Sequence, residues 1–353
     1  MDSPKKKTAG KGSLKIVLLA VAIGVVLLLI LVGVYVLVLM DQITYQPAES
    51  IGETLSPSRI EEILQETLET ADPTEEVLNP TDVTWYTEPA SVLYHQDVVT
   101  ILLIGLDRRP GETVSRSDTM ILCVLNKKTG SATMASLMRD TYVPIPGYLN
   151  ANRINASFAF GGMPLLKECI LQNFGVQVDG CVCVDFEGFV DLMELVGGLD
   201  MELTAEEAAH LNKKEKFYGF PEENWKLKPG VNHLTPKQVL AYSRVRNVGA
   251  GDFGRTERQR KVLTKLLEST KTMSMSQLDS FLKTAAGLVT TDMSQTELLG
   301  CGLSVMPLLS KLELNSIRIP YENYYQSKYV EGVGYVLIPD LYHNRQVLAG
   351  LYE

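Results

Sequence analysis

Hydrophobic and polar positions divide the chain into a basic tail, an apolar run, an acidic region and a long region of alternating patterns. Residues 16–40 contain no charged side chain, and an apolar run of about 20 residues spans the hydrocarbon core of a bilayer. The run is longer than the apolar part of a cleaved signal peptide. It therefore predicts a retained transmembrane anchor, with a buried core helix as the alternative. The basic tail, residues 1–15, places the N-terminus in the cytoplasm and the rest of the chain outside it.

The region from residue 41 to 93 has the pattern of an acidic spacer. Between residues 41 and 100 the chain carries thirteen acidic side chains and one arginine, whereas residues 101–353 are close to neutral. The net charge of −9 is therefore a property of this region. Apolar residues at helical spacing predict one short amphipathic helix that ends near Pro73. We expect an extracytoplasmic stalk without specific partners.

Residues 94–353 alternate between β-rich and helical patterns. Apolar runs predict strands over residues 98–106, 119–126, 131–138, 181–186, 199–203 and 315–320. Helical patterns cover residues 164–175, 186–198, 276–289 and 295–312. The charged stretch 204–229 is expected to be a long loop. Such alternation of strands and helices predicts a layered α/β domain with a mixed sheet.

Cysteine, histidine and glycine positions exclude several kinds of site. The five cysteines show no C-x-x-C spacing and the four histidines are scattered, so neither a zinc site nor a disulfide framework is indicated. The segment Gly249–Gly254 reads G-x-G-x-x-G. It follows the pattern of a helix end rather than a buried strand, so a nucleotide-binding unit is not favoured. The near-neutral domain and the short cytoplasmic tail argue against nucleic-acid binding.

Charged side chains collect at the ends of three predicted strands. They are Asp107 after the first strand, Arg116 and Asp118 before the second, and Arg139 and Asp140 after the third. If Asn126 pairs with Ser131 in the hairpin, Asp118 lies opposite Arg139. Ligand sites of open α/β sheets lie at such an edge. A surface salt bridge between Asp118 and Arg139 explains the pairing equally well.

Residues 241–260 contain five arginines and no lysine. Arginine forks bind the oxygens of phosphate and carboxylate groups in a fixed geometry. A capping box with proline at the first position predicts a helix over residues 236–243. Arg244 and Arg246 follow it, and in an extended segment both would point the same way.

A second helix is expected to begin near Gly254. Arg255, Arg258 and Gln259 lie on the face that continues into an apolar stripe, so this face must pack inward. Polar side chains beside the free backbone amides of a helix N-terminus make an anion site. A solvated, arginine-rich helix start is the alternative. Arg260 lies off this face and is expected to be dispensable.

Six motifs in order resemble the LytR-CpsA-Psr family of membrane-anchored cell-wall enzymes. Between residues 100 and 270 they read GLDRRPGETVSRSDTMIL, SLMRDTYVPIPG, RINASFAFGG, VDFEGFVDLMELVGGLDMEL, LTPKQVLAYSRVR and GDFGRTERQRKVL. The N-terminal apolar run also resembles the anchor of that family. The resemblance implies a catalytic domain over residues 94–353, with C-terminal helices and a strand from residue 271. Its fold would be an α/β/α sandwich with a central mixed sheet, holding a lipid tail in an apolar pocket.

The resemblance also implies an activity. Family members transfer an anionic glycopolymer, such as teichoic acid or capsular polysaccharide, from a polyprenyl diphosphate carrier to peptidoglycan, with the C6 hydroxyl of a muramic acid residue as the acceptor. The resemblance implies a Mg²⁺-dependent phosphotransferase in the cell membrane of a Gram-positive bacterium. Arginines and Mg²⁺ would supply the charge neutralisation that phosphoryl transfer needs. Two alternatives remain open: hydrolysis of polyprenyl diphosphate, and a non-catalytic regulator that only binds polyprenyl phosphates.

The matching motifs also imply roles for individual residues. The implied catalytic residues are Asp107, Arg116, Asp118, Arg139, Arg244 and Arg246. The implied substrate-binding residues are Asp140, Arg153, Asn155, Arg255, Arg258 and Gln259. Asp107 and Asp118 would hold Mg²⁺, and Asp107 is the better candidate of the two for the general base. Arg153 stands where the family usually has lysine, which keeps the charge but changes the contact geometry.

Overall fold

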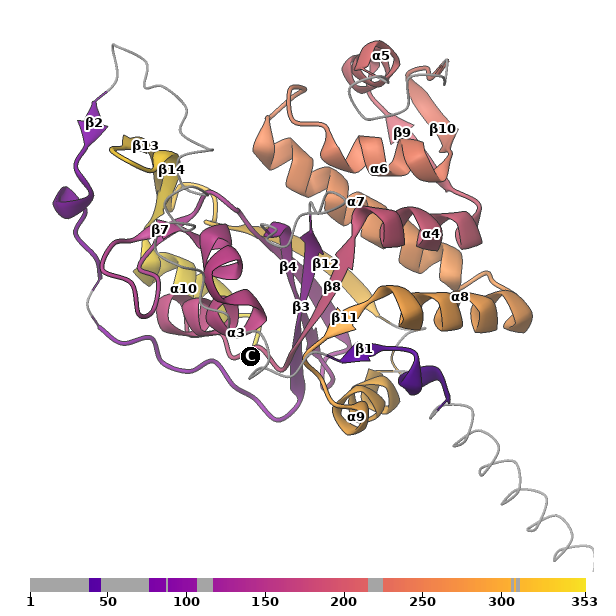
Figure 1. Cartoon of the computed structure of the whole chain (residues 1–353), viewed down its shortest axis with the longest axis horizontal. Helices are drawn as coiled ribbons and strands as arrows, with labels where there is room; N and C mark the ends of the chain where they lie inside the picture. The colour runs from indigo at the N-terminus through magenta and orange to yellow at the C-terminus, as the bar shows by residue number, and fades with distance from the viewer. Residues whose placement is uncertain are drawn as a thin grey trace, which may run out of the picture.

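A mixed seven-stranded sheet forms the centre of the molecule (Figure 1). The computed structural model describes residues 38–45, 76–86, 88–106, 117–214, 225–305, 308 and 312–353. In spatial order the strands are β1 (Thr44–Tyr45), β11 (Thr290–Thr291), β8 (Gly180–Asp185), β3 (Val98–Leu106), β4 (Ser117–Asn126), β5 (Ser131–Leu137) and β12 (Glu313–Ile319). β3 pairs with β8 and β5 with β12 in parallel, whereas β4 is antiparallel to both of its neighbours. The predicted α/β domain with a mixed sheet is confirmed.

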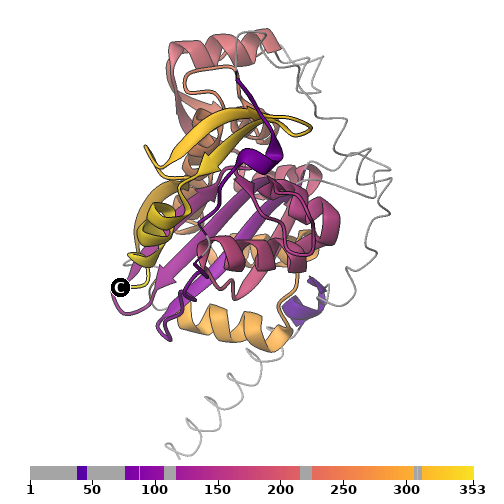
Figure 2. The same cartoon turned by 90° about the vertical axis from the view of Figure 1, so that its left-hand side faces the viewer.

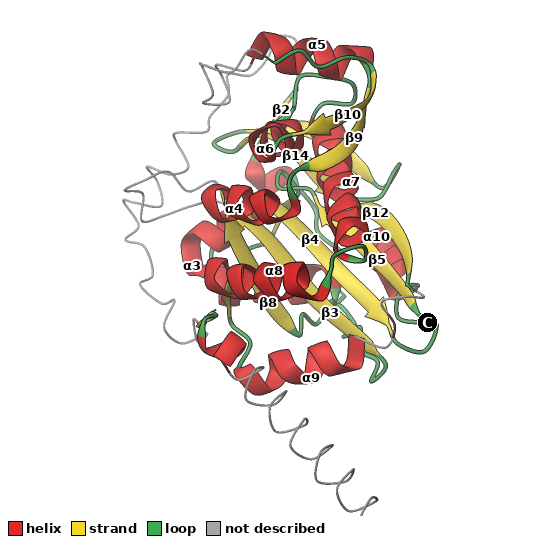
Figure 3. Cartoon of the chain, turned by 90° about the vertical axis from the view of Figure 1, so that its right-hand side faces the viewer, coloured by secondary structure: helices red, strands yellow, loops and turns green. Residues whose placement is uncertain are grey.

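Helices cover both faces of this sheet (Figure 3). One face packs against α3 (Ile154–Phe174) and α10 (Leu341–Ala349). The other face lies under α4 (Phe186–Val196), α6 (Pro236–Arg244), α7 (Asp252–Thr270) and α8 (Met275–Leu288). α9 (Gln295–Val305) lies at the lower end of the sheet in Figure 1. The layers thus follow the expected order of helix, sheet and helix.

The two faces of the central strands are packed to different degrees. β3 alternates between buried and half-buried positions along its whole length. Leu102 pairs with Leu122 on β4, and both side chains are fully buried against the α3 layer. The next pair, Leu103 and Ile121, belongs to the opposite face, where Leu103 is only half-buried. Both faces are apolar, so incomplete burial on one of them indicates space between the sheet and its covering helices.

The stretch predicted to be a long loop contains a helix, α5 (Ala205–Lys214). Its start is a capping box: the backbone amide of Glu207 donates to Thr204 Oγ1, and the Thr204 amide donates to Glu207 Oε2. The residues TAEE, 204–207, carry the S/T-x-x-E signature of such a box. The loop prediction was therefore wrong, although the sequence contains the local signal for this helix start. α5 covers a two-stranded sheet of β9 (Leu199–Leu203) and β10 (Gly230–Leu234).

Parts of the expected spacer pack against the domain. β1 extends the edge of the main sheet beside β11. β2 (Val77–Leu78) joins the three-stranded sheet with β13 (Tyr325–Val330) and β14 (Gly334–Pro339), and η2 (Pro80–Asp82) follows it. The ring of Trp85 lies 5.6 Å from that of Tyr142, on the short strand β6 (Tyr142–Val143) that pairs with β7 (Asn152–Arg153). These described segments are therefore part of the folded domain, whereas the helix predicted before Pro73 lies outside the described residues.

The start of one helix differs from the sequence prediction. α3 begins ten residues earlier than expected, at Ile154, and bends at Gly161 and Gly162, where Gly162 has a φ of 62°. α9 covers Gln295–Val305, and most of the remaining stretch predicted as helix, up to residue 312, lies outside the described residues. In the described part of the chain, no helix is both long and apolar enough to cross a bilayer. The predicted anchor at residues 16–40 falls outside it except for its last three residues.

Candidate functional site

A cavity of about 660 Å³ fills the space between the half-buried face of the sheet and helices α4, α6 and α7. Its volume lies within the range of small-molecule sites. The apolar part of its wall consists of Leu103, Ile104, Ile121, Val182, Val184, Phe186, Phe189, Leu192, Leu240, Val262, Leu263, Leu266 and Val289. Such a lining suits a hydrocarbon chain, because burying apolar surface there removes it from water.

Polar and charged side chains line the cavity where β4 begins and α6 ends. They are Asp118, Thr119, Ser243, Arg244, Arg246, Asn247, Arg255 and Gln259. Thr235 caps α6 at its start, where it forms the predicted capping box with Gln238. The helix ends at Arg244, and the next residue is extended, with φ and ψ of −61° and 123°. This geometry brings Arg244 and Arg246 to the same cavity, as the sequence predicts.

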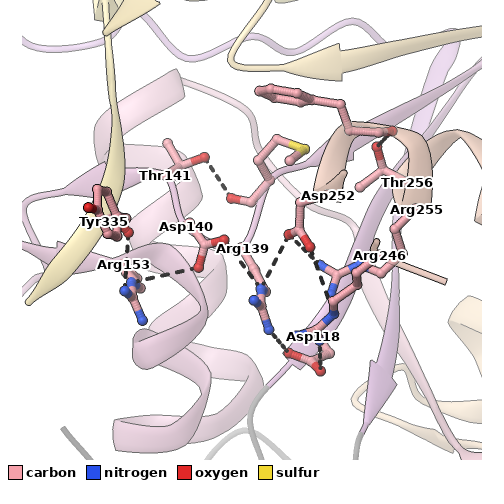
Figure 4. A network of polar contacts seen from close by, with 12 residues as sticks. Asp118, Arg139, Asp140, Thr141, Arg153, Arg246, Asp252, Arg255, Thr256 and Tyr335 are labelled. Carbon is pink, nitrogen blue, oxygen red and sulfur yellow. Dashed lines mark hydrogen bonds and ion pairs between the residues drawn. The ribbon is translucent and has the colours of Figure 1, made fainter. Parts of the chain in front are cut away.

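Asp118 lies at the centre of the charged end, between two arginines (Figure 4). Its Oδ1 accepts a hydrogen bond from Arg139 Nη1 at 3.1 Å, and its Oδ2 accepts one from Arg246 Nη2 at 2.9 Å. Burial alone would raise the pKa of Asp118, but the positive charges of Arg139, Arg255 and Arg246 outweigh it and hold the pKa below its usual value. The expected pairing of Asn126 with Ser131 is also present. The predicted contact between Asp118 and Arg139 is therefore confirmed.

A second carboxylate, Asp252, joins the same group and was missed by the sequence analysis. Its oxygens lie 2.8 Å from Arg255 Nη2, 3.4 Å from Arg139 Nε and 3.8 Å from Arg246 Nε. Asp252 is the first residue of α7, directly after the Gly251 cap, whose φ is 61°. A carboxylate at this position is favoured by the helix dipole. The glycine-rich turn that imitates a nucleotide motif thus places Asp252 among the arginines.

Arg255 is the most deeply buried member of the group, with 2% of its side chain exposed. Nη2 is bonded to Asp252, whereas Nε and Nη1 have no hydrogen-bond partner among the described residues. Burial, together with the neighbouring charge of Arg139, lowers the pKa of Arg255 to about 10. Buried donors are normally paired. An anion entering the cavity would supply the missing acceptors and a compensating charge at the N-terminus of α7.

Two further polar residues define the charged end. The guanidinium of Arg244 lies 4.5 Å from the ring centre of Phe186, at the start of α4. Gln259 Nε2 donates a long hydrogen bond of 3.4 Å to the carbonyl oxygen of Ser243. The cavity therefore combines an apolar interior with a cluster of guanidinium groups at one end. This combination suits an amphiphile that has a long hydrocarbon tail and a phosphorylated head.

Comparison with known proteins agrees with this geometry. The profile of the LytR_cpsA_psr family matches residues 62–347, most of the chain. The chain belongs to the LytR-CpsA-Psr family. It is similar to the polyisoprenyl-teichoic acid–peptidoglycan teichoic acid transferase TagU of Bacillus cereus, with 31% identity over 246 residues that cover 69% of this chain and 74% of TagU.

Solved structures show the same LytR-CpsA-Psr fold. B. subtilis TagV has a TM-score of 0.56 and 25% identity to this chain, and the match covers 73% of this chain and 98% of TagV. The LytR-CPS2A-psr family protein YwtF (TagT), solved with bound octaprenyl pyrophosphate lipid, has a TM-score of 0.55 and 22% identity. That match covers 73% of this chain and 91% of YwtF. The fold implied by the six sequence motifs is thus confirmed.

Three residues expected to bind substrate lie beside the cavity rather than in its wall. Arg153 Nη2 donates to the carbonyl oxygen of Tyr335 at 3.1 Å, and its Nε lies 3.6 Å from Asp140 Oδ1. Asp140 in turn lies 3.3 Å from Arg139 Nε. Asn155 is buried, and its backbone amide donates to the carbonyl oxygen of Arg139. In this LytR-CpsA-Psr protein, Asp140 thus links Arg153 to Arg139 beside the cavity (Figure 4).

Two of the α7 arginines do not occupy the places expected for them. Arg258 is buried and donates to Glu207 at 2.7 Å and to the carbonyl oxygens of Val245 and Val248 at 3.0 Å. It therefore fixes the turn between α6 and α7 and does not line the cavity. Arg260, expected to be off the inward face, is 9% exposed and donates to Ser136 Oγ at 2.6 Å. The predicted place of Arg260 off the inward face is wrong, because the side chain is buried and ties α7 to β5. That Arg260 is dispensable for the site stays a prediction.

The remaining predictions concern Asp107, Arg116 and the metal. Asp107 and Arg116 lie outside the described residues. β3 ends at Leu106, which pairs with Ser117 next to Asp118. Among the described residues there is no group of three or more histidine, cysteine, aspartate or glutamate side chains suited to a metal. Mg²⁺ often takes only one or two carboxylates together with substrate phosphate oxygens, so the Asp118 carboxylate at the cavity suits such an ion.

Proposed function

We propose that this protein transfers an anionic glycopolymer, of the teichoic acid or capsular polysaccharide type, from a polyprenyl diphosphate carrier to peptidoglycan. The observation that carries the proposal is the cavity, whose apolar interior ends at Arg244, Arg246 and Arg255. The similarity to TagU, named as a polyisoprenyl-teichoic acid–peptidoglycan teichoic acid transferase, supports the choice of donor and acceptor. The lipid bound to YwtF supports the placement of a polyprenyl tail in the cavity.

The arginines of the charged end would bind the diphosphate. In the structure, Asp118 and Asp252 accept hydrogen bonds from Arg246 and Arg255. The incoming phosphate oxygens would accept hydrogen bonds from Nε and Nη1 of Arg255, which have no partner among the described residues. They would compete with the two carboxylates for the remaining guanidinium donors. Fixed guanidinium groups stabilise the charge that develops on a transferring phosphoryl group without a protein nucleophile. Arg139 would stay in place, because Asp140 and Asp252 also hold it.

The reaction exchanges one phosphorus–oxygen bond for another. A peptidoglycan hydroxyl, the C6 hydroxyl of muramic acid, attacks the phosphorus that carries the polymer. The bond from this phosphorus to the bridging oxygen breaks, and polyprenyl phosphate leaves with that oxygen. The hydroxyl proton passes to a base, for which Asp107 is the candidate. The products are polyprenyl phosphate and a phosphodiester between polymer and peptidoglycan.

We further propose that Mg²⁺ assists this transfer. Asp118, together with Asp107, would hold the ion, which would neutralise phosphate charge when bound. Both Asp118 oxygens accept hydrogen bonds from arginines, and binding of the diphosphate to those arginines would free one of the oxygens. Titration of Mg²⁺ against chelator is expected to restore transfer, and full transfer in excess chelator would contradict this requirement.

The proposed location is the outer face of the cell membrane. Residues 16–40 would form a single membrane span, with residues 1–15 in the cytoplasm and the domain outside. The support is the uncharged apolar run and the lysines that precede it. The arrangement would keep the cavity close to the leaflet that contains the lipid-linked donor.

Purified full-length protein, a lipid-linked oligosaccharide and peptidoglycan fragments test the function directly. Mass spectrometry is expected to detect the phosphodiester product together with polyprenyl phosphate. Phosphorylated sugar released without the acceptor would identify a hydrolase instead. Tight lipid binding with no product would identify a binding protein. Either of these results would overturn the proposed transfer.

A further inference from the structure

Two arginines, Arg260 and Arg318, lie together at the edge of the sheet and are called here the edge arginines. Arg318 is on β12, the last strand of the seven-stranded sheet, and pairs with Ser136 on β5. Arg260 is on α7, which packs over β5 and β12 (Figure 3). Its Nη1 donates a hydrogen bond to Ser136 Oγ at 2.6 Å. The guanidinium of Arg260 is thus held above β5, beside Arg318.

The edge arginines have no carboxylate partner among the described residues. Glu257 lies one turn before Arg260 on α7, but it is bonded to Lys261 at 2.7 Å. The guanidinium of Arg318 lies 4.3 Å from the ring centre of Phe253. Within the described structure, two positive groups therefore lie side by side without an opposite charge bonded to either of them.

Burial makes this arrangement costly. Arg260 is 9% exposed, and the Nε atoms of Arg260 and Arg318 are both buried without a hydrogen-bond partner among the described residues. Burial lowers the pKa of Arg260; the charge of Glu257 opposes this effect and the charge of Arg318 adds to it. Buried donors are normally paired, and buried charges are normally compensated. A bound anion would supply both the acceptors and the charge, and it can reach the pair through Arg318, which is only half-buried.

The edge arginines and the cavity lie on different faces of α7. Phe253 and Arg260 are seven residues apart, about two helical turns, so both lie on the face that contacts β5 and β12. Gln259 and Val262 lie on the face that lines the cavity. Phe253 directly follows Asp252 of the charged end. A rise of about 1.5 Å per residue places Arg260 about 12 Å along the helix from Asp252.

The C-terminal hairpin borders the surface between the two groups of arginines. β13 and β14, yellow in Figure 2, cross the end of the sheet, where the Leu337 amide donates to the Asp140 carbonyl oxygen at 2.9 Å. The ring centre of Tyr325, at the start of β13, lies 5.7 Å from that of Phe253. Both rings are half-buried. A polymer that leaves the charged end on this side of α7 would pass these rings before it meets the edge arginines.

We propose that the edge arginines bind a phosphate group in the repeating units of the transferred polymer. The proposal rests on the proposed function, and it narrows the substrate to polymers with phosphate in their backbone, as in teichoic acids. Guanidinium forks match the oxygens of a phosphate in charge and geometry. The polymer is joined covalently to the reacting phosphorus, so its next phosphates remain close to the charged end. The acceptor has to bring only one hydroxyl group there.

Titration of the full-length protein with lipid-free poly(glycerol phosphate) oligomers tests the edge arginines directly. Arg318→Ala is expected to bind the oligomer at least about tenfold more weakly than wild type, since it removes charge-assisted hydrogen bonds. Lys265→Ala is the matched control, because it removes a positive charge from the exposed side of α7, where Lys265 is bonded to Glu268. Wild type that binds no oligomer, or Arg318→Ala that binds as well as the control, would overturn the proposal.

A conservative variant and two other ligands complete this titration. Arg318→Lys keeps the charge and is expected to bind the oligomer more tightly than Arg318→Ala, which excludes a folding defect; equal weakness of the two would contradict the proposal. Inorganic phosphate that binds as tightly as the oligomer would identify a site for a free anion instead. Peptidoglycan fragments are expected to bind wild type and Arg318→Ala equally. Binding of these fragments that depends on Arg318 would assign the site to the acceptor and overturn the proposal.

Steady-state kinetics separate this proposal from the proposed function. A lipid donor with glycerol phosphate repeats is compared with a lipid-linked oligosaccharide that has none. Arg318→Ala is expected to raise KM for the first donor at least about tenfold and to leave KM for the second unchanged. Oligomer binding that depends on Arg318, in a protein that transfers neither donor, would keep the phosphate site and reject the transferase. Transfer of both donors with unchanged KM in Arg318→Ala would keep the transferase and reject the site.

Discussion

The two faces of the central sheet are built from equally apolar strands but are used differently. On one face, Leu102 and Leu122 are fully buried against α3. On the other face, the adjacent pair of Leu103 and Ile121 borders a cavity of about 660 Å³. Both faces would bury similar amounts of apolar surface if both were filled. The second face gives up part of that stabilisation, which indicates that its surface is kept for a ligand.

The difference extends to the charges at the edge of the sheet. Away from the cavity, the buried Arg258 is paired with Glu207 at 2.7 Å, although some other buried side-chain atoms, such as the Tyr142 hydroxyl, have no hydrogen-bond partner among the described residues. At the cavity, Arg255 keeps two nitrogen atoms without partners among the described residues. A protein tolerates such unpaired donors where function requires them. Incomplete packing and incomplete pairing thus occur at the same place.

The largest expected effect comes from the packed face. Leu122→Ala removes a fully buried side chain and is expected to lower the free energy of unfolding by about 2–5 kcal/mol. Leu103→Ala, on the cavity face, leaves no new enclosed void and is expected to cost about 1 kcal/mol. Urea denaturation of both variants measures the difference. Equal losses would show that the cavity face is packed as tightly as the other.

The next effect separates two arginines of the same segment. Arg246→Ala removes a guanidinium group that lines the cavity and is 41% exposed. Transfer is expected to fall about 100- to 1,000-fold, since the lost group stabilises the transferring phosphate, while the melting temperature changes little. Transfer assays and thermal melts of the same preparation give both quantities.

Arg260→Ala is the contrasting variant. Arg260 is buried and donates to Ser136 Oγ at 2.6 Å, so its loss is expected to reduce the free energy of unfolding by about 1–3 kcal/mol. The folded fraction should retain its KM for the lipid donor. Arg260→Ala could instead lower transfer as much as Arg246→Ala without loss of stability. The assignment of Arg246 to the cavity and of Arg260 to the packing of α7 against β5 would then be wrong.

Local sequence signals predicted the strands and helices better than they predicted the site on the cavity face. The strand β3, the hairpin pairing of Asn126 with Ser131 and the capping box of α6 all depend on neighbouring residues, and all are present. Asp252 was missed because Arg139 joins it from the end of β5, far away in the sequence, although Arg246 and Arg255 lie within six residues of it. Arg258 was misassigned for the same reason, since its acid lies on α5. Helical periodicity identifies an inward face, but it does not distinguish residues facing a cavity from residues facing another helix.

The smallest expected effect tests the cavity itself. Val182 lies on β8, beside Leu103, and lines the apolar part of the cavity. Val182→Phe would fill part of this space, so affinity for polyprenyl diphosphate is expected to fall about tenfold, equivalent to burying one or two fewer methylene groups of the lipid. The melting temperature should stay the same or rise, because the new ring occupies existing space. Val182→Ile, with one added methyl group, serves as the control, and binding is measured with a fluorescent lipid analogue. Unchanged lipid affinity in a folded Val182→Phe variant would show that the lipid lies elsewhere, and the contrast between the two faces would then have no functional meaning.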